Sequence, residues 1–254
     1  SSAASDVYKR QDKSRHPPAK LPGHQEVARQ VVWWRCRCPK IRVLIAKRDF
    51  ASAFKLLWVE SEGLWIMAVS LVAEDTGECV TVLYLTMVFG WTGAPGEWAV
   101  WGRGVQEAHQ AHQPPQPELH DTVPYACEVL VDDGVLVEPL LAARPWMSAS
   151  AFDEISRRIL GPSSINLAKL AEEGEFTAEK TIWGILFRLE DERGTVIDQA
   201  TLPAAKIEKM SYLLQSPELE PGCRKVPLRL VQQLRGLGAH FSATNAALAT
   251  ELGS

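Results

Sequence analysis

Three aspartates stand where a carboxylate would emerge at the edge of a β-sheet. Asp49 follows residues 41–47, an apolar run with β-branched side chains that is typical of a buried strand. Asp132 and Asp133 stand side by side between two short apolar runs, which predicts a hairpin with both acids at its turn. Adjacent carboxylates repel each other unless a cation joins them, and Mg²⁺ prefers carboxylate oxygens. The acids therefore indicate a site for two divalent ions, as in phosphoryl transfer; the alternative is an ordinary Asp-Asp-Gly turn.

A loop rich in glycine stands between these acids in the sequence. Gly90, Trp91, Gly93 and Pro95 precede residues 96–112, which have the pattern of a helix. The glycines would let the backbone approach a flat ligand closely, and proline is favourable in the first turn of a helix. A generic loop before a helix can have the same composition. The loop therefore indicates a ligand-binding site only in combination with the acids on either side of it in the sequence.

The elements that must position these residues alternate between strands and helices. We expect strands over residues 41–47, 64–72, 80–89, 126–131, 134–138 and 181–188. We expect helices over residues 25–37, 96–112, 149–160, 203–215 and 226–240. This order predicts an α+β domain followed by a helical appendage.

The charge of the chain is uneven. The formal net charge is −4 and the pI about 5.9, which do not mark the whole molecule as a nucleic-acid binder. Residues 20–48 nevertheless hold eight Lys or Arg and one acid, and bases also outnumber acids over residues 202–240. Local basic stretches matter more for phosphate contact than net charge does. The alternative is that these stretches are solvated faces of an acidic protein.

Other features bear on compartment and on the ends of the chain. No apolar run approaches the about 20 residues that a membrane span needs, so we expect no membrane partner. Five irregularly spaced cysteines without a signal peptide indicate reduced thiols in an intracellular protein, in the cytoplasm or nucleus. Residues 1–23 are polar and aperiodic, which predicts disorder. The opening residues 1–11 resemble a translated cDNA adaptor, so we expect the chain to be a fragment.

In this order and spacing, the motifs resemble those of reverse transcriptases. Asp49, with the aromatic Phe54 five residues later, is similar to the first palm motif of the family. The run Gly90–Pro95 is similar to the family's Gly-Trp-x-Gly-x-Pro-like turn before a helix. Asp132-Asp133 fits the aromatic-x-Asp-Asp hairpin, except that Leu130 stands in place of the aromatic residue.

Further motifs extend the resemblance over residues 41–242. Residues 166–169 (Asn-Leu-Ala-Lys) resemble the family's lysine motif, and residues 183–186 (Trp-Gly-Ile-Leu) its primer-gripping turn. Residues 202–207 and 230–236 resemble the start of the thumb in retrotransposon enzymes, especially the tyrosine-recombinase and long-terminal-repeat classes.

The resemblance implies a fold and a division into parts. The fold would be the α+β palm of a polymerase, an antiparallel sheet with packed helices and a ferredoxin-like core, followed by the helical start of a thumb. Residues 1–23 would be disordered and adaptor-derived, residues 24–188 the palm with a remnant of the fingers, and residues 189–254 the start of the thumb.

The resemblance also implies the activity of an RNA-directed DNA polymerase from a retroelement. Two Mg²⁺ or Mn²⁺ ions would drive transfer of deoxynucleotides to the 3′ end of a primer on an RNA or DNA template. Asp49 and Asp132 would bind both metals, the backbone at Phe50 would supply a further oxygen, and Asp133 would complete the acidic cluster. Lys169 would act as general acid toward pyrophosphate.

Binding roles follow from the same resemblance. Phe54 would lie under the sugar and exclude a 2′-hydroxyl. The incoming nucleotide and its base pair would pack on Gly90, Trp91, Gly93 and Pro95. The primer end would be positioned by Trp183 and Gly184. The nucleic-acid backbone would be held by Lys206, Lys209, Arg229 and Arg235.

Three alternatives stay open. The chain could be a catalytically inactive reverse-transcriptase-like domain that binds nucleic acid or protein. It could be a viral RNA-dependent RNA polymerase, although that family has Gly-Asp-Asp at the hairpin and a second aspartate at the position of Phe54, and this sequence has neither feature. It could also be an unrelated α+β domain with an accidental acidic hairpin. The basic fingers segment that holds the triphosphate in reverse transcriptases is almost absent from this sequence.

Overall fold

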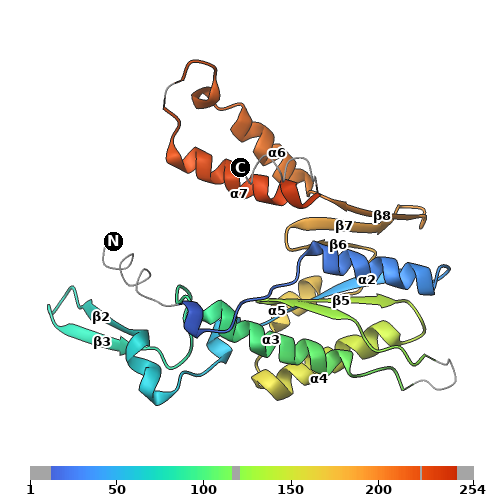
Figure 1. The fold of residues 1–254 in the computed structure, drawn as a ribbon, viewed down its shortest axis with the longest axis horizontal. Coiled ribbons are helices and arrows are strands. Elements are labelled where there is room, and N and C mark those ends of the chain that lie inside the picture. Colours follow the sequence, from blue (N-terminus) through green and yellow to red (C-terminus); the bar gives the residue numbers. More distant parts are fainter. Residues whose placement is uncertain (1–12, 116–120, 224, 245–254) are drawn as a thin grey trace.

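The computed structural model describes residues 13–115, 121–223 and 225–244, and they form an α+β fold with antiparallel sheets. Figure 1 shows two stacked sheet layers, a hairpin that projects from one end and a pair of helices that stands apart. The α-helices are α2 (His24–Arg37), α3 (Ala94–Gln110), α4 (Arg144–Leu160), α5 (Leu167–Glu173), α6 (Ala204–Leu214) and α7 (Leu228–Thr244). The strands are β1 (Val43–Asp49), β2 (Ala68–Val72), β3 (Cys79–Leu83), β4 (Cys127–Leu130), β5 (Asp133–Pro139), β6 (Glu179–Ile182), β7 (Ile185–Glu190) and β8 (Val196–Thr201). Short 3₁₀ turns occupy Lys13–Arg15, Ala53–Leu56, Ser61–Met67 and Pro217–Leu219.

The central sheet has the strand order β1-β5-β4, and all its pairs are antiparallel. β5 is the middle strand, and the β1–β5 ladder pairs Ile45 with Val137 and Ala46 with Leu136. Because paired residues share a face and successive residues alternate, these two pairs point to opposite sides of the sheet. Both strands are apolar on both faces, as a sheet covered on two sides requires.

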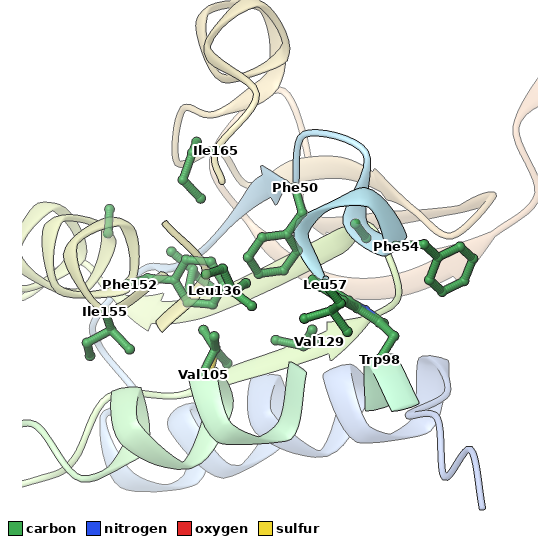
Figure 2. Close-up of a cluster of buried hydrophobic side chains, with 14 of the residues drawn as sticks. Phe50, Phe54, Leu57, Trp98, Val105, Val129, Leu136, Phe152, Ile155 and Ile165 are labelled. Carbon is green, nitrogen blue, oxygen red and sulfur yellow. The ribbon is translucent and has the colours of Figure 1, made fainter. Parts of the chain in front are cut away.

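Helices α3 and α4 cover one face of this sheet. Figure 2 shows their side chains, among them Val105 and Phe152, meeting Leu136 and Val129 from the sheet. The other face is covered by α2 and by the second sheet, which contribute Val27 and Phe187 to a separate buried cluster. The two layers bury the strands from both sides, so the ends of β1 and β5 are held in place by packing.

The second sheet has the order β6-β7-β8 and corrects one expectation. Residues 181–188 were predicted as a single strand, but they cross a hairpin whose turn is Trp183-Gly184. The φ angles of these two residues are 47° and 83°, the left-handed region that the tight two-residue hairpin turn requires. β8, which is largely exposed, was not predicted because its sequence lacks an apolar alternation. The two helices predicted after the strands are present as α6 and α7, and they are in contact with each other.

Other boundaries differ by a few residues. The run 64–72 was predicted as a strand, but its first part belongs to the 3₁₀ turn Ser61–Met67 and only Ala68–Val72 is extended. Helix α4 begins at Arg144, five residues before the predicted start, and α5 was not predicted. The two strands of the β2–β3 hairpin are exposed at every position.

The N-terminal segment, for which the sequence predicts disorder, contacts the start of α3 in its second half. Residues 1–12 lie outside the described residues, so the prediction stays untested there. Residues 16–22 run along the start of α3, where the ring of His16 packs edge-on against Trp91 with 4.9 Å between centroids. His16 Nδ1 also lies 3.1 Å from Glu97 Oε1.

A buried ionic network ties α4 to β5 and to the segment that begins at residue 121. The side chain of Arg144 is fully buried and donates to Glu138 Oε2 at 2.6 Å and to both carboxylate oxygens of Asp121 at 2.9 Å. Burial raises the pKa of Glu138 to about 7, although the charge of Arg144 lowers it. The buried His109 bonds Ser148, and burial lowers its pKa to about 4, so this histidine is a neutral core residue. Within the described part of the chain, no helix is both long enough and apolar enough to cross a bilayer.

We predict that Gly134 cannot accept a side chain without loss of stability. A Cβ on Gly134 would lie 2.6 Å from Cζ of the buried Phe152, which has no room to retreat. Gly134→Ala should therefore lower the free energy of unfolding by about 1–3 kcal/mol, the usual cost of overpacking a core. Gly104, inside α3, has open space around its Cβ position. As the matched control, Gly104→Ala should leave stability unchanged or raise it by up to about 1 kcal/mol. Equal effects of the two variants in urea unfolding would contradict the tight fit.

Candidate active site

The three predicted aspartates meet at one edge of the central sheet. The β1–β5 register sets Asp49 opposite Asp133 as the last pair of the ladder. The next residue, Phe50, donates its backbone N–H to the carbonyl of Asp132 at 2.7 Å. The first strand and the acidic hairpin are therefore neighbours in one antiparallel sheet, which agrees with the antiparallel sheet that the resemblance implied.

The hairpin turn that carries Asp132 has an unusual backbone. Val131 has a φ of 48°, in the left-handed region, which is a genuine outlier for a β-branched residue. Its carbonyl accepts a 2.9 Å hydrogen bond from the indole Nε1 of Trp98 on α3. Backbone strain of this kind costs about 1–3 kcal/mol and persists where the surrounding packing enforces it, as it does at many functional sites. Trp98 therefore holds the hairpin turn in place, a contact for which the only signal in the sequence was an aromatic side chain just inside the helix.

The carboxylates at this edge repel one another. Burial raises the pKa of Asp132, and the charge of Asp49 raises it further. Burial also raises the pKa of Asp133, where Lys47 acts in the opposite direction. One oxygen of Asp132, Oδ1, is buried and has no hydrogen-bond partner within the described structure. An unpaired buried carboxylate oxygen costs free energy unless a ligand satisfies it, so this atom fits a position for a cation.

Asp49 already has two partners. Lys169 on α5 places its ammonium 2.5 Å from Oδ1, and Asn166 donates its side-chain amide to Oδ2 at 2.9 Å. Asn166 also caps α5, because its side chain accepts from the backbone N–H of Lys169. The hydrogen bond to Asp49 raises the pKa of the Lys169 ammonium, so this lysine stays protonated at neutral pH. Residues 166–169, which resemble the lysine motif, thus contain two side chains, Asn166 and Lys169, that contact Asp49.

This pairing explains why the acids do not form a ready-made set of ligands. Among the residues that the structure describes, no three His, Cys, Asp or Glu side chains are arranged to hold a metal ion. Both oxygens of Asp49 are turned to Lys169 and Asn166. A metal at Asp49 would have to displace the half-exposed Lys169 side chain, which can swing away on its methylene stem.

The other predicted site residues lie in three places. The loop at Gly90 and Trp91 leads into α3, which begins at Ala94 with Pro95 in its first turn. Phe54 is only 5% exposed, and its ring packs edge-on against Phe89 at 4.8 Å, so the structure gives it a packing contact beside its proposed role as a wall. Trp183 and Gly184 form the turn between β6 and β7. The helical pair carries the remaining four residues. Lys206 on α6 is half-buried, whereas Lys209 on α6 and Arg229 and Arg235 on α7 are exposed.

Comparison with known proteins shows the fold. No protein-family model matches the sequence, and no curated protein is similar to it in sequence. The foamy viral protease-reverse transcriptase, solved in complex with double-stranded DNA, is similar in structure, with a TM-score of 0.50 and 14% sequence identity. The likeness covers 80% of this chain but 28% of the viral chain. The chain therefore has a reverse-transcriptase-like fold and spans little more than a quarter of that viral chain.

Asp132→Asn should leave stability unchanged or raise it in the absence of metal. A carboxyl group whose pKa is higher in the folded than in the unfolded state costs stability once the pH passes these values. That cost is absent at pH values below the pKa of the unfolded chain, about 3.9. It reaches its full size at pH values above the raised pKa of the folded state. The stability of the variant relative to wild type should therefore grow as the pH rises from about 3 to 7.

Thermal melting across this pH range, with titration of Mg²⁺ and Mn²⁺, checks the prediction. Metal should stabilise the wild type by mass action and affect Asp132→Asn much less. Glu154→Gln, an exposed site on α4, is the control for loss of one negative charge. A variant that melts earlier at pH 7, together with a wild type indifferent to both metals, would leave Asp132 as an ordinary turn residue.

Proposed function

We propose that this chain is the palm and the start of the thumb of a retroelement RNA-directed DNA polymerase, which adds deoxynucleotides to the 3′ end of a primer. The observation that carries the proposal is the β1–β5 register, which ends on the pair Asp49 and Asp133 and brings Asp132 beside it on a reverse-transcriptase-like fold. Residues 24–188 would form the palm with a remnant of the fingers, and the chain from residue 189 the start of the thumb.

The acidic edge would hold two Mg²⁺ or Mn²⁺ ions. Such ions supply charge neutralisation at the attacking hydroxyl and at the departing phosphate. Asp49 and Asp132 would be the carboxylate ligands, the backbone carbonyl of Phe50 would add an oxygen, and Asp133 would add negative charge. The Oδ1 of Asp132, which has no hydrogen-bond partner among the described residues, supports this assignment, because a cation would satisfy it.

Lys169 would have two successive roles. Without metal, its ammonium neutralises Asp49, as the ion pair shows. Once released from Asp49, the same ammonium would stand beside the site and give a proton to the departing pyrophosphate. The long side chain and its half-exposed position support such a movement.

Nucleic acid would be the macromolecular partner. The viral neighbour was solved in complex with double-stranded DNA. In this chain, an RNA or DNA template with its primer would lie on the loop Gly90–Pro95 and on the turn Trp183-Gly184. The exposed lysine and arginine side chains of α6 and α7 would contact the phosphate backbone, which would account for the local basic stretch in an acidic protein.

A second candidate function is a reverse-transcriptase-like domain that binds nucleic acid or protein without catalysis. The observation that favours it is the occupation of both Asp49 oxygens by Lys169 and Asn166. In this reading the lysine is a permanent structural counterion. The two functions differ in whether divalent metal can displace it.

Primer extension on an RNA and a DNA template, with Mg²⁺ or Mn²⁺, tests the proposal. Asp49→Asn and Asp132→Asn should each lower the extension rate at least about a hundredfold, because each removes a metal ligand worth several kcal/mol in the transition state. Glu154→Gln should extend at the wild-type rate. Absence of extension by folded wild type, with unimpaired binding of the primer–template, would favour the non-catalytic domain.

Phe54 is expected to exclude ribonucleotides. Phe54→Val should raise the ratio of ribonucleotide to deoxynucleotide incorporation by at least about tenfold, because a smaller side chain leaves room for the 2′-hydroxyl. The same change replaces a buried aromatic ring by a smaller aliphatic group and should also lower the free energy of unfolding by about 1–3 kcal/mol. Urea unfolding measured beside single-nucleotide incorporation separates the two effects. A loss of stability without any change in the ratio would mean that Phe54 is a core residue only.

A further inference from the structure

The β2–β3 hairpin leaves large apolar side chains uncovered by the described residues. It projects from one end of the molecule (Figure 1), and every position of both strands is exposed. The register pairs Val69 with Val82 and Leu71 with Val80, so these four side chains share one face, and each is at least 36% exposed. Exposed apolar side chains continue over the adjoining residues: Trp58, Trp65, Ile66, Tyr84, Leu85 and Phe89. A continuous apolar surface of this kind indicates an interaction site.

The outer edge of β3 is open. Within the described structure, β3 belongs to a sheet of two strands. At the turn end of this ladder, Ala73 donates its N–H to the carbonyl of Glu78. Because hydrogen-bonded pairs alternate with non-bonded pairs along an antiparallel ladder, the N–H and C=O groups of Cys79, Thr81 and Leu83 point away from β2. These backbone groups can therefore bond a further strand.

The two strands lack the usual protection of a sheet edge. Native edge strands are commonly guarded by Lys, by Pro or by a β-bulge, each of which hinders pairing with another chain. β2 and β3 contain no Pro and no charged residue, and their ladder has no bulge. β3 offers the longer edge, because the chain beyond it pairs again, at Thr86 with Trp58, whereas the 3₁₀ turn Ser61–Met67 precedes β2. An isolated two-stranded hairpin is marginally stable in water, so a third strand would stabilise it.

The charge around the hairpin selects the partner. Residues 56–102 contain six acidic residues and no Lys or Arg. Glu74, Asp75 and Glu78 are exposed at the turn of the hairpin, and none of them forms an ion pair with another described residue. A second copy of this hairpin would bring like charges together, whereas a segment that carries Lys or Arg would be attracted.

We propose that β3 binds an extended segment of another polypeptide as a third strand. The segment has apolar side chains on the face of Val80 and Val82, and Lys or Arg at the end beside Glu74 and Glu78. Backbone hydrogen bonds along the edge supply affinity, and the side chains supply specificity, as in other cases of strand addition. The hairpin is separate from the acidic edge of the central sheet, so the interaction does not depend on the proposed function.

Binding of a fluorescent peptide to the full chain, in buffer without nucleic acid, tests the interaction. The probe is a peptide of alternating valine and threonine with lysines at both ends. Its binding should be saturable, and the same peptide with glutamates in place of the lysines should bind at least about tenfold more weakly. A lysine peptide N-methylated on every valine and threonine should also bind at least about tenfold more weakly, because it cannot donate hydrogen bonds to the edge of β3.

Charge reversal at the turn should exchange the preference. Glu74→Lys combined with Glu78→Lys should weaken binding of the lysine peptide by at least about tenfold and strengthen binding of the glutamate peptide. Glu154→Lys combined with Glu192→Lys changes the net charge equally at exposed sites on α4 and after β7, and should keep the wild-type preference. Circular dichroism checks that each variant is folded. Where the turn variant fails to fold, the N-methylated peptide carries the test on wild type.

Three results would overturn the proposal. Wild type that binds the lysine and glutamate peptides equally, or binds neither, has no charge-selective strand site. Equal binding of the N-methylated peptide would mean that the apolar face, and not the edge, makes the contact. A wild-type chain that dimerises without peptide in analytical ultracentrifugation, beside a monomeric Val80→Lys variant, would assign the hairpin to a second copy. Each of these results leaves primer extension, and with it the proposed function, to be decided separately.

Discussion

The antiparallel ladder between β1 and β5 is the constraint on which the rest of the structure depends. Its register runs from Val43 opposite Pro139 to Asp49 opposite Asp133. A slip of β1 by one residue would exchange its two faces, moving Ile45 and Ala46 into each other's cluster. It would also separate the acids at the end of the ladder. The packing that holds the two hydrophobic layers in place therefore also holds the carboxylates at one edge.

The acidic edge is a place where the fold accepts a cost. Val131 is held at a positive φ, the pKa values of Asp132 and Asp133 are raised, and Oδ1 of Asp132 has no partner in the described structure. Lys169 reduces the repulsion by pairing with Asp49. Stable proteins tolerate such concentrations of strain and charge mostly at functional sites. The ammonium of Lys169 neutralises Asp49 in this metal-free structure. This ion pair is compatible with both proposed functions.

The helical pair is connected to the rest of the molecule through a small junction. α2 packs on the central sheet and on the second sheet, and its first residue, His24, reaches the β6–β7 turn. Lys206 and His240 reach the same turn from α6 and α7.

Local sequence determined the elements, and tertiary structure decided how they meet. The apolar runs around Asp49 and around Asp132-Asp133 predicted a strand and a hairpin, because a period of two and turn residues depend only on neighbours in the chain. Resemblance to reverse transcriptases predicted that these acids belong together, and the register places them at one edge.

The resemblance to reverse transcriptases placed Lys169 at the site, but the contacts that these acids make could not be predicted from the sequence. Asn166 and Lys169 contact Asp49 across more than a hundred residues, and Trp98 holds the hairpin turn from a helix. The predicted single strand over residues 181–188 is a hairpin because Trp183 adopts a positive φ that its own preference disfavours and that packing on His24 supports. Such contacts depend on how layers stack, and stacking is settled by burial summed over the whole chain rather than by any short stretch of it.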